Sequence, residues 1–310
     1  MKSNPSSVKR AASIDIGTNT ILLLIAEVGE GEINPLFEME TVVRLGENLQ
    51  KTGVISSQAM DRGMQTLTQY LKQCQVWEVQ KLFAVGTSAL REAKNSEVFL
   101  RLVKEKLNLS IEVISGEEEA QLSFLAVAKD LQEQEKSILV VDGGGGSTEF
   151  ILGRGDQISR WISLPLGSVR FTEEFLHSDP VQEEEWQKME QEIRKLLINI
   201  PHSKEPLSIV AVGGTATTLA SVEQGLEDFI AERIHHFVLE KEALKNQLLL
   251  YRTKTIEERK KISGLPMARA DVILAGAAIL YLTMEEVKRP SVLISCHGVR
   301  HGLIYKRLTL

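Results

Sequence analysis

Apolar and polar positions divide the first half of the chain into strands and helices. Short apolar runs are typical of buried strands, whereas apolar residues three or four positions apart are typical of helices that pack on a sheet. Three strand-like runs come first, and helices then separate the later strands, which predicts an α/β protein with a mixed sheet. The predicted strands are Ala11–Ile16, Ile21–Val28, Leu36–Leu45, Lys81–Val85 and Ile111–Ile114, and the predicted helices are Ser57–Gln73 and Asn95–Leu107.

The second half repeats this order, after a helix near Glu117–Lys129 that we expect to join two lobes. Asp179 and Pro180 are predicted to begin a helix over Gln182–Ile198, as its N-cap and its first-turn proline. The other predicted elements are strands at Ser137–Val141, Thr148–Leu152, Ile158–Leu164, Leu207–Val212 and Ser291–Cys296, and helices at Lys241–Tyr251, Met267–Met284 and the C-terminus.

Each half carries a similar motif between its first two strands. The first reads DIGTNT, residues 15–20, and the second reads DGGGGSTE, residues 142–149. A tight turn between apolar strands exposes peptide N–H groups and small hydroxyls that can bind a phosphate, and an Asp at its mouth can hold a cation on that phosphate. Two such turns, a domain length apart, predict two lobes that bind one phosphorylated substrate.

The second motif fits neither of two common phosphate-binding patterns. No Gly-Lys-Ser/Thr follows its glycines, so it is not a P-loop, and Thr148 stands where the dinucleotide fingerprint requires its last glycine. A flexible hairpin turn is the structural alternative. Four consecutive glycines between strands cost backbone entropy, however, which favours the close approach of a ligand. DIGTNT alone does not separate a turn from a site, and its similarity to the second motif favours a site.

Three carboxylates stand at the start of a predicted helix in EVISGEEEAQLSF. Ser115 and Glu118 match the Ser-x-x-Glu capping box, and the helix dipole alone explains Glu117. Glu119 has neither role, so it is the candidate base that orients and deprotonates a water. The alternative is that all three only stabilise the helix end.

Several other residues are weaker candidates. In VGGTATT a predicted strand ends at Gly213 and Gly214, and a predicted helix follows. This pattern fits either close packing of the helix or anion binding at its start. Arg91 follows a strand that ends near the Asp15 turn, and it stands out among five arginines. We find no complete metal-ligand set in the sequence around the histidines, so we expect none of them to be functional. The other arginines are Arg44, Arg170, Arg269 and Arg300, and the cysteine and histidines considered are Cys296, His235, His236, His297 and His301.

Composition and charge indicate which partners the protein can attract and in which cellular compartment it is expected. The chain has 310 residues, 43% of them hydrophobic and 25% charged, with a formal net charge of -6. These values are ordinary for a globular protein and give no overall attraction to nucleic acid or to an anionic membrane. Cys74 and Cys296 lie far apart, as expected for core thiols in a reducing compartment. We therefore expect a cytoplasmic protein that binds neither nucleic acid nor membrane, and the oligomeric state stays open, a homodimer included.

The motifs together resemble the exopolyphosphatase and guanosine pentaphosphate phosphohydrolase family, in the actin-like phosphotransferase superfamily. The resemblance covers essentially the whole chain. It implies two ribonuclease-H-like domains, residues 1–123 with the C-terminal helix 299–310 and residues 124–298, with the active site in a cleft between them. It also implies Mg²⁺-assisted hydrolysis of a terminal phosphate from polyphosphate or guanosine pentaphosphate. The motifs, in chain order, are DIGTNT, VGTSALREA, ISGEEEAQLSF, VVDGGGGSTEF, LPLGSVR, VAVGGTATTLA, RADVILAGAAIL and HGVRHGLI.

The resemblance also assigns roles to individual residues. Glu119 would be the general base for water, and Arg91 would clamp phosphate. Asp142 and Glu149 would hold Mg²⁺ together with Asp15. The predicted substrate-binding residues are Thr18 and Asn19 in the first turn, Gly144, Gly145, Gly146 and Ser147 in the second, and Gly213, Gly214 and Thr215.

Two departures from the family bear on the substrate. Many relatives carry Arg or His shortly after the first phosphate turn, where this chain has Ile21, Leu22 and Leu23. Longer relatives continue into a helical domain that helps to bind long polymers, so we expect short chains or nucleotides to be preferred here. Two other classes stay open: a kinase or ATPase on the same scaffold, and a non-catalytic sensor of guanosine tetraphosphate or pentaphosphate.

Overall fold

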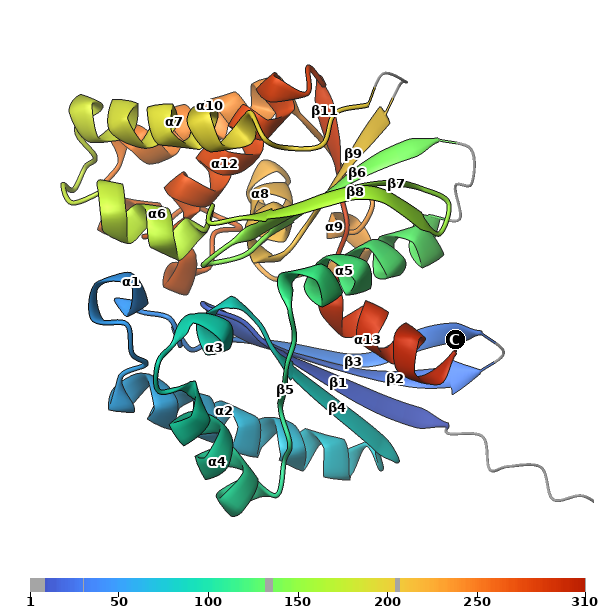
Figure 1. Ribbon diagram of the computed structural model, residues 1–310. Coiled ribbons are helices and arrows are strands. Elements are labelled where there is room, and N and C mark those ends of the chain that lie inside the picture. Colours follow the sequence, from blue (N-terminus) through green and yellow to red (C-terminus); the bar gives the residue numbers. More distant parts are fainter. Residues whose placement is uncertain (1–8, 30, 132–135, 204–206, 310) are drawn as a thin grey trace, which may run out of the picture. The chain divides into compact units, whose positions relative to one another are not determined.

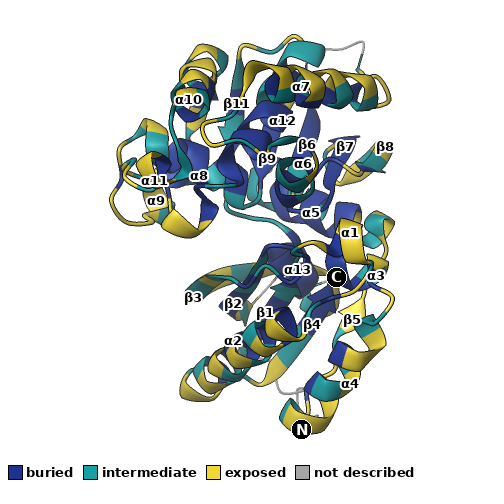
Figure 2. Ribbon diagram, turned by 90° about the vertical axis from the view of Figure 1, so that its left-hand side faces the viewer, coloured by how far each residue is buried: buried dark blue, intermediate teal, exposed yellow. Residues whose placement is uncertain are grey.

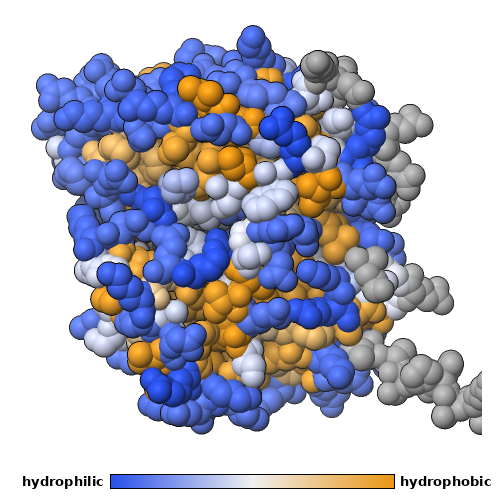
Figure 3. Space-filling view, in the orientation of Figure 1, coloured by the Kyte–Doolittle hydropathy of each residue, from blue (hydrophilic) through white to orange (hydrophobic). Residues whose placement is uncertain are grey.

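The computed structural model describes residues 9–29, 31–131, 136–203 and 207–309. These residues fall into two compact units, which we describe separately. Unit 1 comprises Met1–Ala126 and Val299–Leu310, and unit 2 comprises Val127–Gly298. Figure 3 shows polar side chains over much of the visible surface, with apolar patches among them. In the described part of the chain, no helix combines the length and apolar character needed to cross a bilayer.

Unit 1 is built on a five-stranded sheet in the order β3-β2-β1-β4-β5 (Figure 1). The first three strands are antiparallel neighbours, and β1, β4 and β5 run parallel. This is the ribonuclease-H-like order that the resemblance implies. The strands are β1 (Arg10–Ile16), β2 (Thr20–Gly29), β3 (Glu32–Val42), β4 (Lys81–Gly86) and β5 (Glu112–Val113).

Side chains of successive residues on β1 enter two different cores, because neighbouring residues of a strand point to opposite faces. Ala12, Ile14 and Ile16 pack in a cluster with residues of α2 and α4, whereas Ala11 packs with Ile304 of α13. Helices therefore cover both faces of this sheet. The helices are α1 (Leu49–Thr52), α2 (Ser57–Val76), α3 (Ser88–Glu92), α4 (Ser96–Leu107), α5 (Gly116–Leu131), whose residues from Val127 onward belong to unit 2, and α13 (Val299–Leu308).

Unit 2 repeats the same order of strands and adds one more at the edge. Its six-stranded sheet has the order β10-β11-β9-β6-β7-β8. The strands β6, β7 and β8 are antiparallel neighbours, and β6, β9 and β11 run parallel. The two mixed sheets confirm the predicted fold class. The strands are β6 (Ser137–Gly143), β7 (Thr148–Arg154), β8 (Gln157–Leu164), β9 (Leu207–Val212), β10 (Val238–Glu240) and β11 (Ser291–Ile294).

One helix, α12 (Ile273–Glu286), is buried along most of its length in the core of unit 2, and Figure 2 shows it in dark blue while α7 has an exposed outer side. Its residues pack in one cluster with residues of the sheet and of α7, α8 and α10. The continuous apolar run ADVILAGAAILYL fits a helix surrounded by protein on all sides. The other helices are α6 (Ser168–Phe175), α7 (Glu183–Leu197), α8 (Gly214–Glu223), α9 (Ala231–Ile234), α10 (Lys241–Thr253), α11 (Ile256–Arg259) and a 3-10 turn η1 (Met267–Arg269).

Two helix predictions were wrong in detail. The N-cap of α7 is Gln182 and not Asp179. A carboxylate oxygen of Asp179 instead accepts the peptide N–H of Ile256 at 2.8 Å, at the start of α11. The predicted helix Met267–Met284 is split into η1 and α12, because the chain turns at residues 270–272.

Candidate active site

The turn between β1 and β2 holds two buried polar side chains, those of Thr18 and Asn19. The peptide N–H of Gly17 donates to the Thr20 carbonyl at 3.0 Å and closes the turn. Thr18 and Asn19 are only 7% and 5% exposed. Among the described residues, neither the Thr18 hydroxyl nor the Asn19 side-chain amide has a hydrogen-bond partner. Buried polar groups of this kind are costly unless a ligand or water satisfies them, so this turn is suited to a polar ligand.

Arg91 and Glu119 form a partly buried ion pair in unit 1. Strand β4 runs parallel to β1, and its Val85 pairs with Asp15, so α3 starts beside the Asp15 turn as predicted. Arg91 Nη1 lies 2.7 Å from Glu119 Oε2 and also donates to the Ile114 carbonyl at 3.0 Å. The two side chains are 23% and 10% exposed. The pair thus holds a cation and a carboxylate in one fixed geometry.

The other two carboxylates at the start of α5 have structural partners, and the cap predicted for Glu118 is confirmed. The Ser115 hydroxyl accepts the Glu118 peptide N–H at 3.1 Å, and Glu118 Oε2 accepts the Ser115 N–H at 3.4 Å, which forms the capping box. Glu117 accepts a hydrogen bond from Gln121 at 3.4 Å. Only Glu119 turns into the protein, where it is 8% exposed.

The turn between β6 and β7 matches the first turn position by position. The peptide N–H of Gly144 donates to the Ser147 carbonyl at 2.9 Å, as that of Gly17 does to Thr20. Asp142 and Glu149 are direct neighbours across the antiparallel pair β6–β7. Glu149 is 1% exposed, and its Oε1 accepts hydrogen bonds from Ser147 Oγ at 3.0 Å and from Ser163 Oγ at 2.7 Å.

The carbonyl groups of this turn are directed toward α6. The Gly144 carbonyl accepts the Ser168 peptide N–H, the Gly145 carbonyl accepts that of Val169, and the Gly146 carbonyl accepts Arg170 Nε at 2.8 Å. In a trans peptide the N–H points opposite to the carbonyl. The N–H groups of Gly145, Gly146 and Ser147 therefore point away from α6, in the arrangement that binds anions.

Gly167 lets the start of α6 approach the turn closely. A Cβ on Gly167 would lie 2.2 Å from the Gly145 carbonyl oxygen. No other amino acid fits without moving this backbone, which explains the glycine in the LPLGSVR motif.

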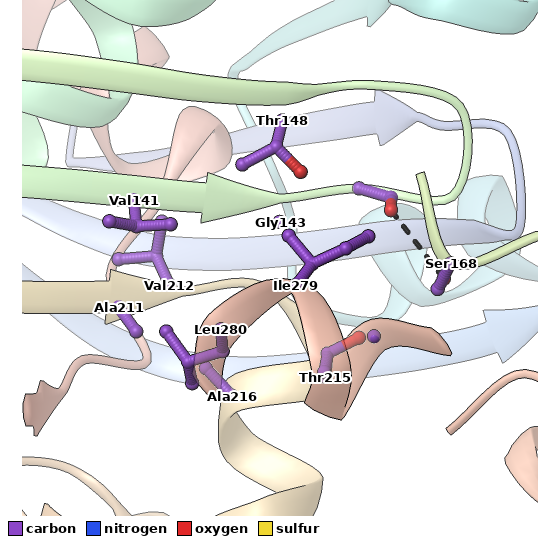
Figure 4. A pocket seen from close by; sticks show the side chains of 12 residues that line it. Val141, Gly143, Thr148, Ser168, Ala211, Val212, Thr215, Ala216, Ile279 and Leu280 are labelled. Carbon is purple, nitrogen blue, oxygen red and sulfur yellow. Dashed lines mark hydrogen bonds between the residues drawn. The ribbon is translucent and has the colours of Figure 1, made fainter. Parts of the chain in front are cut away.

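The VGGTATT segment begins α8 beside the same turn. Gly213 has a positive φ of 93°, and a Cβ there would lie 2.8 Å from the Gly143 carbonyl oxygen. A Cβ on Gly214 would overlap the guanidinium of Arg269, which is 6% exposed. The segment is thus packed between the turn and a buried cation. An adjacent cavity has a volume of about 20 Å³, which is room for about one water and none for a substrate. Figure 4 shows Thr215, Ile279 and Leu280 among the residues that line it.

Comparisons with known proteins place these motifs in a family. The model of the Ppx/GppA phosphatase family matches residues 24–310. The chain belongs to this family. It is 31% identical to exopolyphosphatase 2 of Mycobacterium tuberculosis over 96% of this chain and 98% of the relative. It is 34% identical to a bifunctional 3-dehydroquinate synthase/phosphatase of Fusobacterium nucleatum over 92% of this chain, which spans 44% of that relative's length.

A solved structure agrees with the family assignment. The crystal structure of the Aquifex aeolicus member of the Ppx/GppA family is 35% identical in sequence, and the match covers 96% of each chain with a TM-score of 0.81. The resemblance that the motifs carried is therefore confirmed for the family and for the fold.

Two other candidate arginines of the Ppx/GppA chain bind structural partners through their guanidinium groups. Arg170 binds the turn carbonyl of Gly146, and Arg300 pairs with Glu38. Arg44 has a positive φ of 50°, and its carbonyl accepts a hydrogen bond from Arg62. Sequence reasoning missed Ser163, which is opposite Glu149 on β8. Only the pairing of β7 with β8 reveals it, because a serine on a strand carries no signal of its own.

Proposed function

We propose that this chain removes the terminal phosphate of inorganic polyphosphate or guanosine pentaphosphate by water attack. The main support for this proposal is the Arg91–Glu119 pair. A non-catalytic sensor could bind phosphate with the arginine alone and would not need a buried carboxylate beside it. The name of the Mycobacterium tuberculosis relative, exopolyphosphatase 2, and the phosphatase name of the family support the substrate class.

Glu119 is the proposed base. It accepts a proton from water while the water oxygen forms a bond to the terminal phosphorus, and the bridging P–O bond breaks as the shortened substrate leaves. Arg91 has further N–H groups besides those bound to Glu119 and Ile114, and these can bind phosphate oxygens. The guanidinium thus positions the base and stabilises charge on the transferred phosphate.

The turn residues are proposed to bind phosphate oxygens. In unit 2 the N–H groups of Gly145, Gly146 and Ser147 have the required direction. In unit 1 the side chains of Thr18 and Asn19 are the proposed donors. The Gly144 N–H already closes its turn and is not counted among the donors.

Asp142 and Glu149 are proposed to hold Mg²⁺. Asp15 stands at the equivalent position of unit 1, and the metal role that the resemblance gives it stays a prediction. The donor set fits, because carboxylate oxygens are the ligands that this hard cation prefers. The hydroxyls of Ser147 and Ser163 fix the orientation of Glu149. When bound, magnesium supplies positive charge next to the phosphate oxygens.

A magnesium titration of phosphate release tests this assignment. Asp142→Asn should raise the half-saturating Mg²⁺ concentration at least about tenfold, the usual scale for a perturbed metal site. Asp156→Asn, in the exposed turn between β7 and β8, is the matched control and should titrate like the native chain. An unchanged titration in Asp142→Asn would remove Asp142 from the metal site.

A further inference from the structure

Unit 2 contains a cluster of one carboxylate and three imidazoles outside the proposed phosphate-binding residues, and its histidines are ones that the sequence provided no reason to expect as ligands. Asp130 lies in the last turn of α5, His235 and His236 follow α9, and His297 follows β11. Asp130 Oδ1 lies 3.2 Å from His235 Nε2 and 3.6 Å from His297 Nδ1. Asp130 Oδ2 lies 2.7 Å from His236 Nε2. The side chain of Asp130 is 10% exposed and those of His235 and His297 about 20%, so the cluster is sheltered but open to small ions.

The hydrogen bonds of His235 define where its ring proton lies. The peptide N–H of Cys296 donates to His235 Nδ1 at 3.1 Å. The ring proton is therefore on Nε2, which donates it to Asp130. Burial raises the pKa of Asp130, but the hydrogen bonds from His235 and His236 outweigh that effect and lower the pKa to about 2. The carboxylate is thus ionised at neutral pH.

The spacing of the two imidazole nitrogens from Asp130 Oδ1 fits a transition metal site. The ligand atoms of Asp130, His235 and His297 all lie within 4.8 Å of one another. With metal–ligand bonds of about 2.0–2.1 Å, the ligand atoms of a tetrahedral site are roughly 3.3 Å apart. The distances of 3.2 and 3.6 Å from Asp130 Oδ1 are close to this value. We propose that Asp130, His235 and His297 form a binding site for Zn²⁺ or a similar first-row divalent ion, with a fourth position open to water.

The ligand chemistry separates this site from the magnesium site. Two imidazole nitrogens and one carboxylate suit Zn²⁺, Co²⁺ or Ni²⁺, whereas Mg²⁺ prefers oxygen ligands. His236 binds the second carboxylate oxygen and so holds Asp130 in orientation, as outer partners of metal ligands commonly do.

Metal binding requires a change of tautomer at His235. Nε2 must give up its proton to bind the ion, and Nδ1 takes up a proton, so that no net proton is released from this ring. The Cys296 N–H then loses its acceptor and faces the Nδ1 proton, so the ring or the peptide must shift to separate the two donors. The lost hydrogen bond costs about 1 kcal/mol, which binding of the ion has to outweigh.

The site joins the two ends of unit 2. Asp130 lies close to Val127, where the chain enters this unit, and His297 directly precedes Gly298, where it leaves. A bound ion would therefore link the first and last segments of unit 2 and stabilise that unit.

Isothermal titration of the tag-free full-length protein with Zn²⁺, in millimolar Mg²⁺, tests the proposal. The native chain should bind one Zn²⁺ per chain. Asp130→Asn, a near-isosteric change, and His297→Ala should each weaken binding at least about tenfold. His202→Ala is the control, because His202 is a half-exposed histidine of unit 2 that pairs only loosely with Glu286 at 3.7 Å. No binding to the native chain, or equal binding by all variants, would overturn the proposal.

A second measurement does not depend on the variants. Long-range ¹H–¹⁵N spectra of the imidazoles should show His235 with its proton on Nε2 in the metal-free protein and on Nδ1 after addition of Zn²⁺. Co²⁺ should give the visible absorption of a four-coordinate ion. A His235 tautomer that stays unchanged at saturating Zn²⁺ would exclude His235 as a ligand and contradict the site as proposed.

Discussion

At the scale of single residues, the central distinction is between neighbouring carboxylates of one helix turn. Glu117 and Glu118 interact with Gln121 and with the Ser115 cap, whereas Glu119 pairs with Arg91 inside unit 1. The capping pattern in the sequence sufficed to separate them. We therefore expect Glu119 to act in catalysis and Glu117 and Glu118 to act only at the start of the helix, although the three residues are adjacent.

We predict that Glu119→Gln keeps the fold but lowers kcat by roughly 10² to 10⁴, the usual scale for a lost general base. Glu118→Gln is the matched control and should lose only a little stability at the start of α5. Steady-state phosphate release, together with thermal unfolding of both variants, measures the difference. If Glu118→Gln were inactive and Glu119→Gln active, the base would have been assigned to the wrong carboxylate.

At the scale of elements, the start of α8 depends on a glycine that no other residue replaces easily. Gly213→Ala should lower the free energy of unfolding by about 1–3 kcal/mol, because φ is positive and the new Cβ meets the Gly143 carbonyl. Gly143→Ala should be tolerated, since a Cβ there has no neighbour within 4 Å. Urea unfolding of the two variants compares them, and equal stability would contradict the close approach of α8 to the turn.

The start of α7 should be sensitive to pH through Glu185. Burial raises the pKa of Glu185, but hydrogen bonds from the peptide N–H groups of Ser178, Gln182 and His177 outweigh it and lower the pKa below its ordinary 4.5. Because the pKa is lowered, the ionised Glu185 stabilises the folded state. This contribution to the free energy of unfolding is fully present above about pH 4.5 and is lost as the pH falls through the pKa that Glu185 has in the folded state.

Glu185→Gln should therefore cost about 1 kcal/mol at pH 7, as loss of a helix cap does, and much less at pH 3. Urea unfolding at both values measures this, with Glu184→Gln in the same helix turn as the control. A penalty for Glu185→Gln that is the same at both pH values would show that its charge has no part in the cap.

Element prediction succeeded where a local pattern decides the structure and failed where distant contacts decide it. The strands β1, β6 and β9 were predicted to within two residues, because long apolar runs leave few alternatives. The false N-cap at Asp179 arose because its side chain binds α11, which is far away in sequence. Helix α6 was missed because its start is defined by contacts with the Gly145 carbonyl rather than by a capping residue.

At the scale of the whole molecule, the two units repeat one plan. Asp15 and Asp142 are equivalent, as are Gly17 and Gly144, and the same hydrogen bond closes both turns. The near-repeat in the sequence revealed this plan because each turn lies between two apolar strands. The cluster around Asp130 stayed hidden, since its members come from three segments that only folding brings together.

Phosphate release from a panel of substrates decides whether the chain is the proposed phosphohydrolase. Polyphosphate of several lengths, guanosine pentaphosphate, and ATP with and without an acceptor would be incubated with the native chain and with Glu119→Gln, and binding followed by calorimetry. We expect the native chain to release phosphate from polyphosphate or guanosine pentaphosphate, and Glu119→Gln to bind the same substrate with little turnover. Binding without release by the native chain, or consumption of ATP only with an acceptor, would contradict the proposed function.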